Sequence, residues 1–273
     1  MTTDRIKKKF AHIKAQRKTG LILYLTAGFP DLDATEELIP ALVEAGADGI
    51  EVGVPFSDPL ADGATIQASS FHALQQGVTL RDCVDLVQRL RPKVPETPMI
   101  LMGYYNPIFS FGLKDFCQEA QRATVDGLIV PDLPVEESGP LLEQCRAHGI
   151  HLIPLLAPTS TEERIKKVCA VASGFVYCVS VTGVTGARDN LNSGVAHLVN
   201  RVRRHTSLPL GVGIGVSTRE HIEAVSRVAD AAIVGSALIR VIQDSPRNEM
   251  VARASRFVKE IRGVAPVLSK EGR

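Results

Sequence analysis

LIPALVEAGADGIEVGVPFSDPLADG, residues 38–63, contains in one stretch the pattern that decides the fold. Leu38, Leu42 and Ala45 share one face of a helix. The short turn 45–48 leads into the apolar strand 49–52, and the long polar loop 53–63 follows it. A short connection before a strand and a long one after it are typical of a parallel β/α unit whose site lies at the carboxyl end of the strand.

The same alternation of apolar strand and amphipathic helix runs through the whole chain. Because the expected strands are almost entirely apolar, they are typical of parallel strands covered on both faces. Eight strands with helices between them favour a closed (β/α)8 barrel, the TIM barrel, over an open doubly wound sheet, which usually has fewer strands. The expected strands are 21–25, 49–52, 99–103, 127–130, 151–155, 175–179, 210–213 and 231–234.

The chain shows no Gly/Ser-rich linker and no break in composition, so residues 1–273 are expected to form a single α/β domain. Ile6, Phe10 and Ile13 stand at helical spacing and predict an extra amino-terminal helix within residues 1–18. We also expect helical additions after strands two and eight, and a flexible tail at 263–273.

Composition excludes several classes of function. The net charge of +1, the absence of Trp and an aromatic content of 5% argue against nucleic-acid binding and against an anionic membrane surface. No apolar run approaches the length of a membrane span. The five cysteines are scattered, without a CxxC pair, which suits a reducing compartment. A cytoplasmic location is expected.

Two carboxylates are the candidate catalytic groups. Glu51 interrupts the apolar strand and alternates with Ile50 and Val52, so it is predicted to face the barrel interior. A carboxylate there must be paired, hydrogen-bonded or used in chemistry. Asp62 ends the long loop that follows and can overhang the same pocket. Two carboxylates in unlike surroundings can divide the general acid and general base roles, although Glu51 in a structural network and Asp62 as a helix cap remain alternatives.

Glycine-rich segments after strands six, seven and eight predict a phosphate site. They are 182–186, 211–215 and the pair Gly235-Ser236, which opens a helix. Glycine lets backbone N–H groups approach phosphate oxygens, and a helix amino terminus adds a favourable dipole. Barrels often bind phosphate with these last loops.

Other ligand patterns are weaker. GxGxG at 211–215 has the wrong spacing and the wrong strand for a dinucleotide fingerprint. His148 and His151 have the spacing of a metal pair, but they flank a turn on the expected non-catalytic face. No metal and no cofactor are expected.

Four segments together resemble the tryptophan synthase alpha chain family, and the resemblance covers residues 5–265. The second is the most specific, since it includes both carboxylates at the family's spacing. The segments are TAGFPD at 26–31, EVGVPFSDPLADG at 51–63, PDLPVEES at 131–138 and VTGVTGAR at 181–188.

The resemblance implies cleavage of indole-3-glycerol phosphate to indole and glyceraldehyde 3-phosphate without a cofactor. Glu51 matches the family's general acid/base, and Asp62 matches the carboxylate that accepts a hydrogen bond from the indole N–H. The remaining matches are phosphate binders (Gly186, Gly213, Gly235 and Ser236), pocket walls (Tyr104, Ile129 and Tyr177) and a closing loop (Thr185). Val212 and Gly215 stand where Phe and Ser are common, so a looser indole pocket is expected.

The resemblance also implies a beta-chain partner in an alpha2beta2 heterotetramer, met through the second loop and residues 131–134. Two alternatives stay open: a stand-alone lyase without a beta partner, and a catalytically silent barrel that serves only as an activator. A phosphosugar isomerase would explain the phosphate loops but not an apolar pocket.

Overall fold

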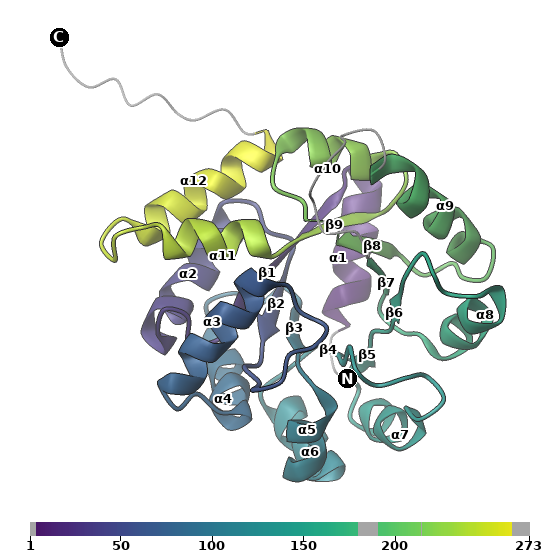
Figure 1. Ribbon diagram of the computed structural model, residues 1–273, viewed down its shortest axis with the longest axis horizontal. Coiled ribbons are helices and arrows are strands. Elements are labelled where there is room, and N and C mark those ends of the chain that lie inside the picture. Colours follow the sequence, from purple (N-terminus) through teal and green to yellow (C-terminus); the bar gives the residue numbers. More distant parts are fainter. Residues whose placement is uncertain (1–3, 180–190, 214, 264–273) are drawn as a thin grey trace.

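The computed structural model describes residues 4–179, 191–213 and 215–263, in which one parallel sheet curls into a ring surrounded by helices (Figure 1). Neighbouring strands follow the order β5-β4-β3-β2-β1-β9-β8-β7-β6. The strands are β1 (Gly20–Thr26), β2 (Gly49–Gly53), β3 (Met99–Met102), β4 (Gly127–Ile129), β5 (His151–Leu152), β6 (Leu155–Leu156), β7 (Val176–Val179), β8 (Leu210–Gly213) and β9 (Ala231–Val234). The predicted TIM barrel is confirmed.

The fifth predicted strand, 151–155, is divided into β5 and β6, which stand at the two ends of the strand order. Pro154 lies between them and has no backbone N–H to give to a ladder. Hydrogen bonds nevertheless continue across it, because Ile153 N donates to Leu128 O at 2.9 Å and Pro154 O accepts from Tyr177 N at 3.0 Å. The two halves therefore act as one interrupted strand that closes the barrel.

Helices cover the outside of the ring (Figure 1). Two follow β2 and two follow β9, as expected, and α5 before α6 is a further addition that was not predicted. The helices are α1 (Arg5–Ala15), α2 (Leu32–Glu44), α3 (Ala64–Gln75), α4 (Leu80–Leu90), α5 (Tyr105–Phe111), α6 (Leu113–Arg122), α7 (Gly139–Ala147), α8 (Glu162–Val171), α9 (Leu191–Arg203), α10 (Arg219–Ser226), α11 (Ser236–Gln243) and α12 (Met250–Arg262).

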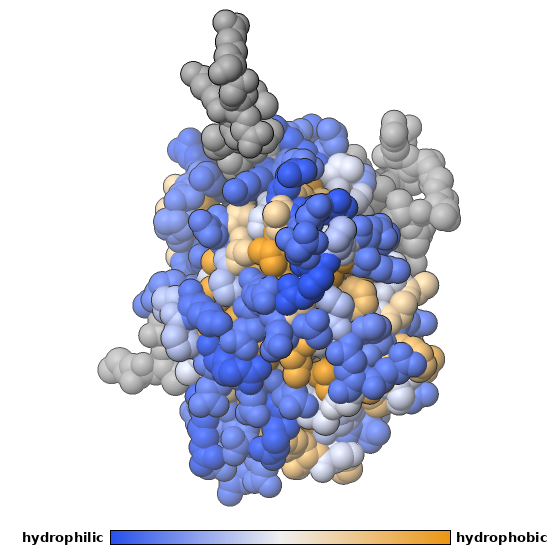
Figure 2. Space-filling model, turned by 90° about the vertical axis from the view of Figure 1, so that its left-hand side faces the viewer, coloured by the Kyte–Doolittle hydropathy of each residue, from blue (hydrophilic) through white to orange (hydrophobic). Residues whose placement is uncertain are grey.

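Local sequence signals explain where several of these helices begin. The Asp31 side chain accepts from Ala34 N and starts α2, and Thr79 with Asp82 forms a capping box at α4. The polar faces of the outer helices point to solvent, and Figure 2 shows a largely hydrophilic surface on the side of α2, α11 and α12, with small apolar areas between. None of the helices in the described ranges is long and apolar enough to cross a membrane.

Helix α1 closes the amino-terminal end of the barrel. Its buried residues Ile6, Phe10 and Ile13 pack on interior side chains of the strands, and the rings of Phe10 and Phe175 lie 5.7 Å apart. Arg5 fixes the helix by an ion pair of 3.0 Å with Asp126. Since this end is filled, a substrate has to enter at the opposite end, where the strands finish.

Candidate active site

Glu51 lies inside the barrel on β2, with Tyr24 of β1 and Ile100 of β3 as its partners in the strand register. The side chain is fully buried. On the same face of β2, a Cβ at Gly53 would collide with the Tyr24 hydroxyl, which shows that this face of the strand is turned to the interior. The predicted orientation of Glu51 therefore agrees with the geometry.

The Glu51 carboxyl group is isolated. In the described part of the chain neither of its oxygens has a hydrogen-bond partner. Burial without a compensating charge raises its pKa to about 8. The side chain is therefore protonated at neutral pH and can act as a proton donor, and the alternative of a satisfied structural network does not apply to it.

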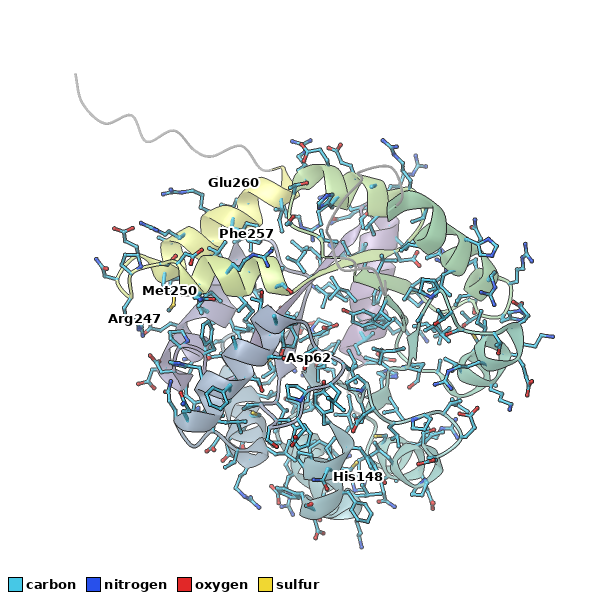
Figure 3. The ribbon with its side chains drawn as sticks, in the orientation of Figure 1. Asp62, His148, Arg247, Met250, Phe257 and Glu260 are labelled. Atoms are coloured by element: carbon cyan, nitrogen blue, oxygen red, sulfur yellow. The ribbon has the colours of Figure 1, made fainter. Side chains whose placement is uncertain are left out.

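Asp62 follows β2 on the loop that leads to α3, and Figure 3 shows it close to the middle of the ring. Its carboxylate accepts a hydrogen bond from the Tyr104 hydroxyl at 3.1 Å. Burial raises the pKa of Asp62 to about 6, and this hydrogen bond opposes the rise. The residue that caps α3 is Gly63, without a side-chain bond, so Asp62 is not a helix cap.

The loop that carries Asp62 is tied to the body of the protein at several points. Phe56 N donates to Ser70 Oγ at 2.9 Å, and Gln67 Nε2 donates to Asp62 O at 2.9 Å, both from α3. The Phe56 ring stacks on Tyr104 with centroids 5.0 Å apart. These contacts hold Asp62 over the barrel within the single chain.

Both carboxylates act on the same two tyrosines. Burial, then Asp62 and Glu51 among other groups, raise the pKa of the Tyr24 hydroxyl, and burial followed by Glu51 and Asp62 raises the pKa of Tyr177. Tyr24 belongs to β1 and Tyr177 to β7, so the two acids are surrounded by groups from separate strands. One acid is protonated at neutral pH and the other ionised, which suits divided acid–base work.

The predicted phosphate residues meet at the last strands. Gly213 ends β8, Gly235 precedes α11, and Ser236 is the first residue of that helix. A Cβ at Gly213 would collide with the Tyr177 hydroxyl, so glycine is required there. Gly186 and Thr185, the other predicted residues of these loops, lie outside the described residues.

The predicted pocket walls are distributed as expected for two of three strands' interior faces. Ile129 is buried in the interior cluster, and Tyr177 packs beside Phe175 with ring centroids 6.4 Å apart. Tyr104 stands at the mouth, beyond the end of β3, and contacts Asp62 instead of filling the barrel.

The expected loosening of the pocket by Val212 is wrong. Gly211 and Gly213, its neighbours on β8, face the interior rings of Phe175 and Tyr177. Alternation along the strand turns Val212 the other way, into the cluster between strands and helices.

Sequence reasoning missed Tyr24, Thr26 and Ser69. Thr26 Oγ1 lies 2.6 Å from Ser69 Oγ and 3.4 Å from the Tyr24 hydroxyl. Tyr24 alternates in phase with Ile22, which was a signal that it faces inwards, but only the register of β1 against β2 reveals that Glu51 is its neighbour.

The two histidines at metal-like spacing have separate contacts. The ring of His148 lies 2.9 Å from the Gln144 carbonyl, and His151 lies 3.1 Å from Asp4 at the start of α1. Figure 3 shows His148 at the rim of the molecule, far from Asp62. The pair is not part of the site.

Comparison with known proteins gives a consistent result. The family described as "Tryptophan synthase alpha chain" matches residues 10–265. The tryptophan synthase alpha chain of Roseiflexus sp. (strain RS-1) is 51% identical over 95% of this chain and 100% of its own length, and that of Thermoanaerobacter sp. (strain X514) is 44% identical over 96% and 99%.

Solved structures agree. Tryptophan synthase subunit alpha from Legionella pneumophila superposes with a TM-score of 0.88 at 35% identity, covering 96% of this chain and 98% of that one. A chain of the tryptophan synthase complex from Pyrococcus furiosus gives 0.83 at 39% identity, covering 90% and 98%.

The fold and the site together define a (β/α)8-barrel protein with an acid–base pair at the carboxyl ends of its strands. Within that class, the chain belongs to the tryptophan synthase alpha chain family.

Proposed function

We propose that this protein is a lyase that cleaves indole-3-glycerol phosphate into indole and glyceraldehyde 3-phosphate. The observation that carries the proposal is the isolated, fully buried carboxyl group of Glu51 on the interior face of β2, beneath the loop that holds Asp62. Membership of the family supports the choice of substrate.

The two acids divide the work. Glu51 starts protonated and gives its proton to indole C3, which places positive charge on the ring nitrogen. Asp62, ionised at neutral pH, accepts a hydrogen bond from the indole N–H and stabilises that charge. The Glu51 carboxylate then takes the proton of the side-chain hydroxyl, the carbon–carbon bond breaks, and its electron pair restores the indole ring.

The phosphate end of the substrate fits the opposite part of the mouth. Backbone N–H groups at Gly213, Gly235 and Ser236 are the proposed ligands, and the amino terminus of α11 supplies a favourable dipole. Gly186 joins them, and Thr185 belongs to a loop that closes near Asp62. Ile129, Tyr177 and Tyr104 line the indole end.

We further propose a beta-chain partner, an alpha2beta2 heterotetramer and a cytoplasmic location. Two relatives of solved structure carry titles of tryptophan synthase complexes. On the face where the strands end, Leu60 and Phe109 are large apolar side chains with exposed fractions of 92% and 62%. Exposed apolar residues beside residues 131–134 suit a protein interface.

The test is to incubate the purified chain with indole-3-glycerol phosphate and to measure indole and glyceraldehyde 3-phosphate, with and without a beta chain. Equal amounts of the two products support the lyase. A rate that is high alone and unchanged by the beta chain supports a stand-alone lyase. Absence of both products, with activation of the beta chain retained, supports the silent barrel instead.

A further inference from the structure

Tyr24 is a buried ionisable residue that the proposed reaction does not use. It lies on β1 directly beside Glu51 on β2, and these two strands are neighbours in the ring (Figure 1). Its hydroxyl occupies the space that a Cβ at Gly53 would fill, two residues from Glu51 on the same face of β2. The Tyr24 hydroxyl is therefore within reach of the flexible Glu51 side chain.

The hydrogen bonds around Tyr24 have a fixed direction. Ser69 donates its single hydroxyl proton to Ile66 O at 2.9 Å, so Ser69 Oγ has to accept from Thr26 at 2.6 Å. The proton of Thr26 is thereby used, and Thr26 Oγ1 can only accept from Tyr24. Tyr24 is the one member of the chain whose proton is free to turn elsewhere.

Tyr24 holds this last bond weakly. Its distance of 3.4 Å to Thr26 Oγ1 exceeds the roughly 2.7–2.8 Å common for hydroxyl donors. The Glu51 oxygens have no partner among the described side chains. Once Glu51 is ionised, a bond to it is charge-assisted and about twice as strong as a neutral one.

The other titratable groups that face this pair are Tyr177 from β7, Asp62 from the loop and Tyr104 after β3. None of them is a cation that would neutralise the Glu51 carboxylate. Tyr177 reaches in from a different wall, with its hydroxyl over Gly213.

We propose that Tyr24 is a positioning residue for Glu51: its hydroxyl turns from Thr26 to the Glu51 carboxylate when the proton has moved to the substrate, and turns back when Glu51 is protonated again. Tyr24 keeps its own proton throughout, because burial raises the pKa of its hydroxyl. The role in turnover rests on the lyase function proposed above; the pairing of Tyr24 with ionised Glu51 does not.

The first test replaces Tyr24 with Phe, which removes only the hydroxyl. Because the bond forms after substrate has bound, kcat is expected to fall by about 10- to 100-fold, the effect of a lost bond to a charged group, with KM nearly unchanged. The bond favours ionised Glu51, so its loss moves the basic limb of the kcat profile up by about one pH unit.

Ser69→Ala is the matched control. It breaks the link from Thr26 to α3 but leaves the Tyr24 hydroxyl in place, so the basic limb should stay at its wild-type pH. If Tyr24 served only to anchor β1 to α3, Ser69→Ala would reproduce the defect of Tyr24→Phe. That result, or an unmoved limb in Tyr24→Phe, overturns the proposal.

A readout without substrate separates this proposal from the lyase function. Infrared titration of the free chain follows the protonated carboxyl band of Glu51, assigned by its loss in Glu51→Gln. The midpoint should lie at higher pH in Tyr24→Phe than in wild type and in Ser69→Ala. Equal midpoints contradict the proposal even if the wild-type chain cleaves the substrate; a shifted midpoint in a chain that releases no indole sinks the lyase function alone.

Discussion

The Tyr104 hydroxyl links Asp62 to the backbone of its own loop: it donates to Asp62 Oδ2 at 3.1 Å and accepts from Ala61 N at 3.0 Å. One side chain, placed just beyond β3, therefore sets both the position and the acidity of a carboxylate that comes from β2. Since Asp62 is needed in its ionised form, the two effects act in the same direction.

Replacement of Tyr104 with Phe should weaken both effects. The hydrogen bond lowers the pKa of Asp62, so its loss raises that pKa above about 6 and moves the acid limb of the rate to higher pH. The freed loop should cost about a further tenfold in kcat/KM. The measurement is the pH dependence of indole release. Tyr105→Phe is the control, because the Tyr105 hydroxyl makes none of the described hydrogen bonds; equal profiles for the two variants would refute the role of Tyr104.

The wild-type rate should depend on pH as a bell. Below about pH 6 Asp62 gains a proton and no longer stabilises the indole nitrogen, and above about pH 8 Glu51 loses the proton it has to donate. The maximum of kcat/KM should lie near neutrality when measured from pH 5 to 9 at constant ionic strength. A rate that climbs steadily to pH 9 would show that Glu51 does not act as the initial acid.

Glu51 should also weaken the fold as pH rises. Its pKa is about 8 in the folded chain and near 4.5 when unfolded, so the folded state binds the proton more tightly and loses stability as pH rises from 4.5 to 8. Glu51→Gln lacks this dependence and should gain on wild type by a few kcal/mol at most between pH 5 and pH 8. Thermal melts at the two pH values test this; a constant difference in Tm would contradict it.

Gly213→Ala should impair substrate binding. The added Cβ meets the Tyr177 hydroxyl and ring, so either Tyr177 or the strand end has to shift at the proposed phosphate site. We expect KM to rise by about tenfold, or roughly 1.4 kcal/mol, and inorganic phosphate to compete less well. Gly139→Ala, where the new methyl group meets nothing within 4 Å, is the control and should keep wild-type kinetics.

Asp126 should matter for stability and not for chemistry. Its side chain, 5% exposed, pairs with Arg5 at 3.0 Å and Arg91 at 2.7 Å at the closed end of the barrel. Asp126→Ala leaves two half-buried cations without their partner and should cost about 3 kcal/mol in urea unfolding. Glu36→Ala, in a more exposed pair network, should cost about 1 kcal/mol or less. Similar losses in both variants would contradict this account.

Much of the fold could be predicted because the strands are apolar on both faces and the long loops fall after them. Seven predicted strands agree with the structure to within a residue or so at each end, and the fifth is interrupted at Pro154, where a missing N–H breaks the ladder. The helix α5 was missed because it is short and its buried face has little periodicity; Ile108 is its single fully buried residue.

The site was predictable only where one strand carries the signal. Alternation along β2 predicts that Glu51 faces inwards, but the pairing of Tyr24 with Glu51 depends on the register between strands, and the bond from Tyr104 to Asp62 depends on how a loop folds back. The error about Val212 has the same origin, since one position of register decides which face of β8 it occupies.

The central claim is that the protonated carboxyl group of Glu51 drives the cleavage. The most direct measurement is single-turnover indole release by Glu51→Gln beside wild type, with substrate binding followed by calorimetry and folding by circular dichroism. A folded variant that binds indole-3-glycerol phosphate as wild type does, but releases indole at least about 10²- to 10⁴-fold more slowly, is the predicted result. Near wild-type release by a folded Glu51→Gln chain would contradict the account.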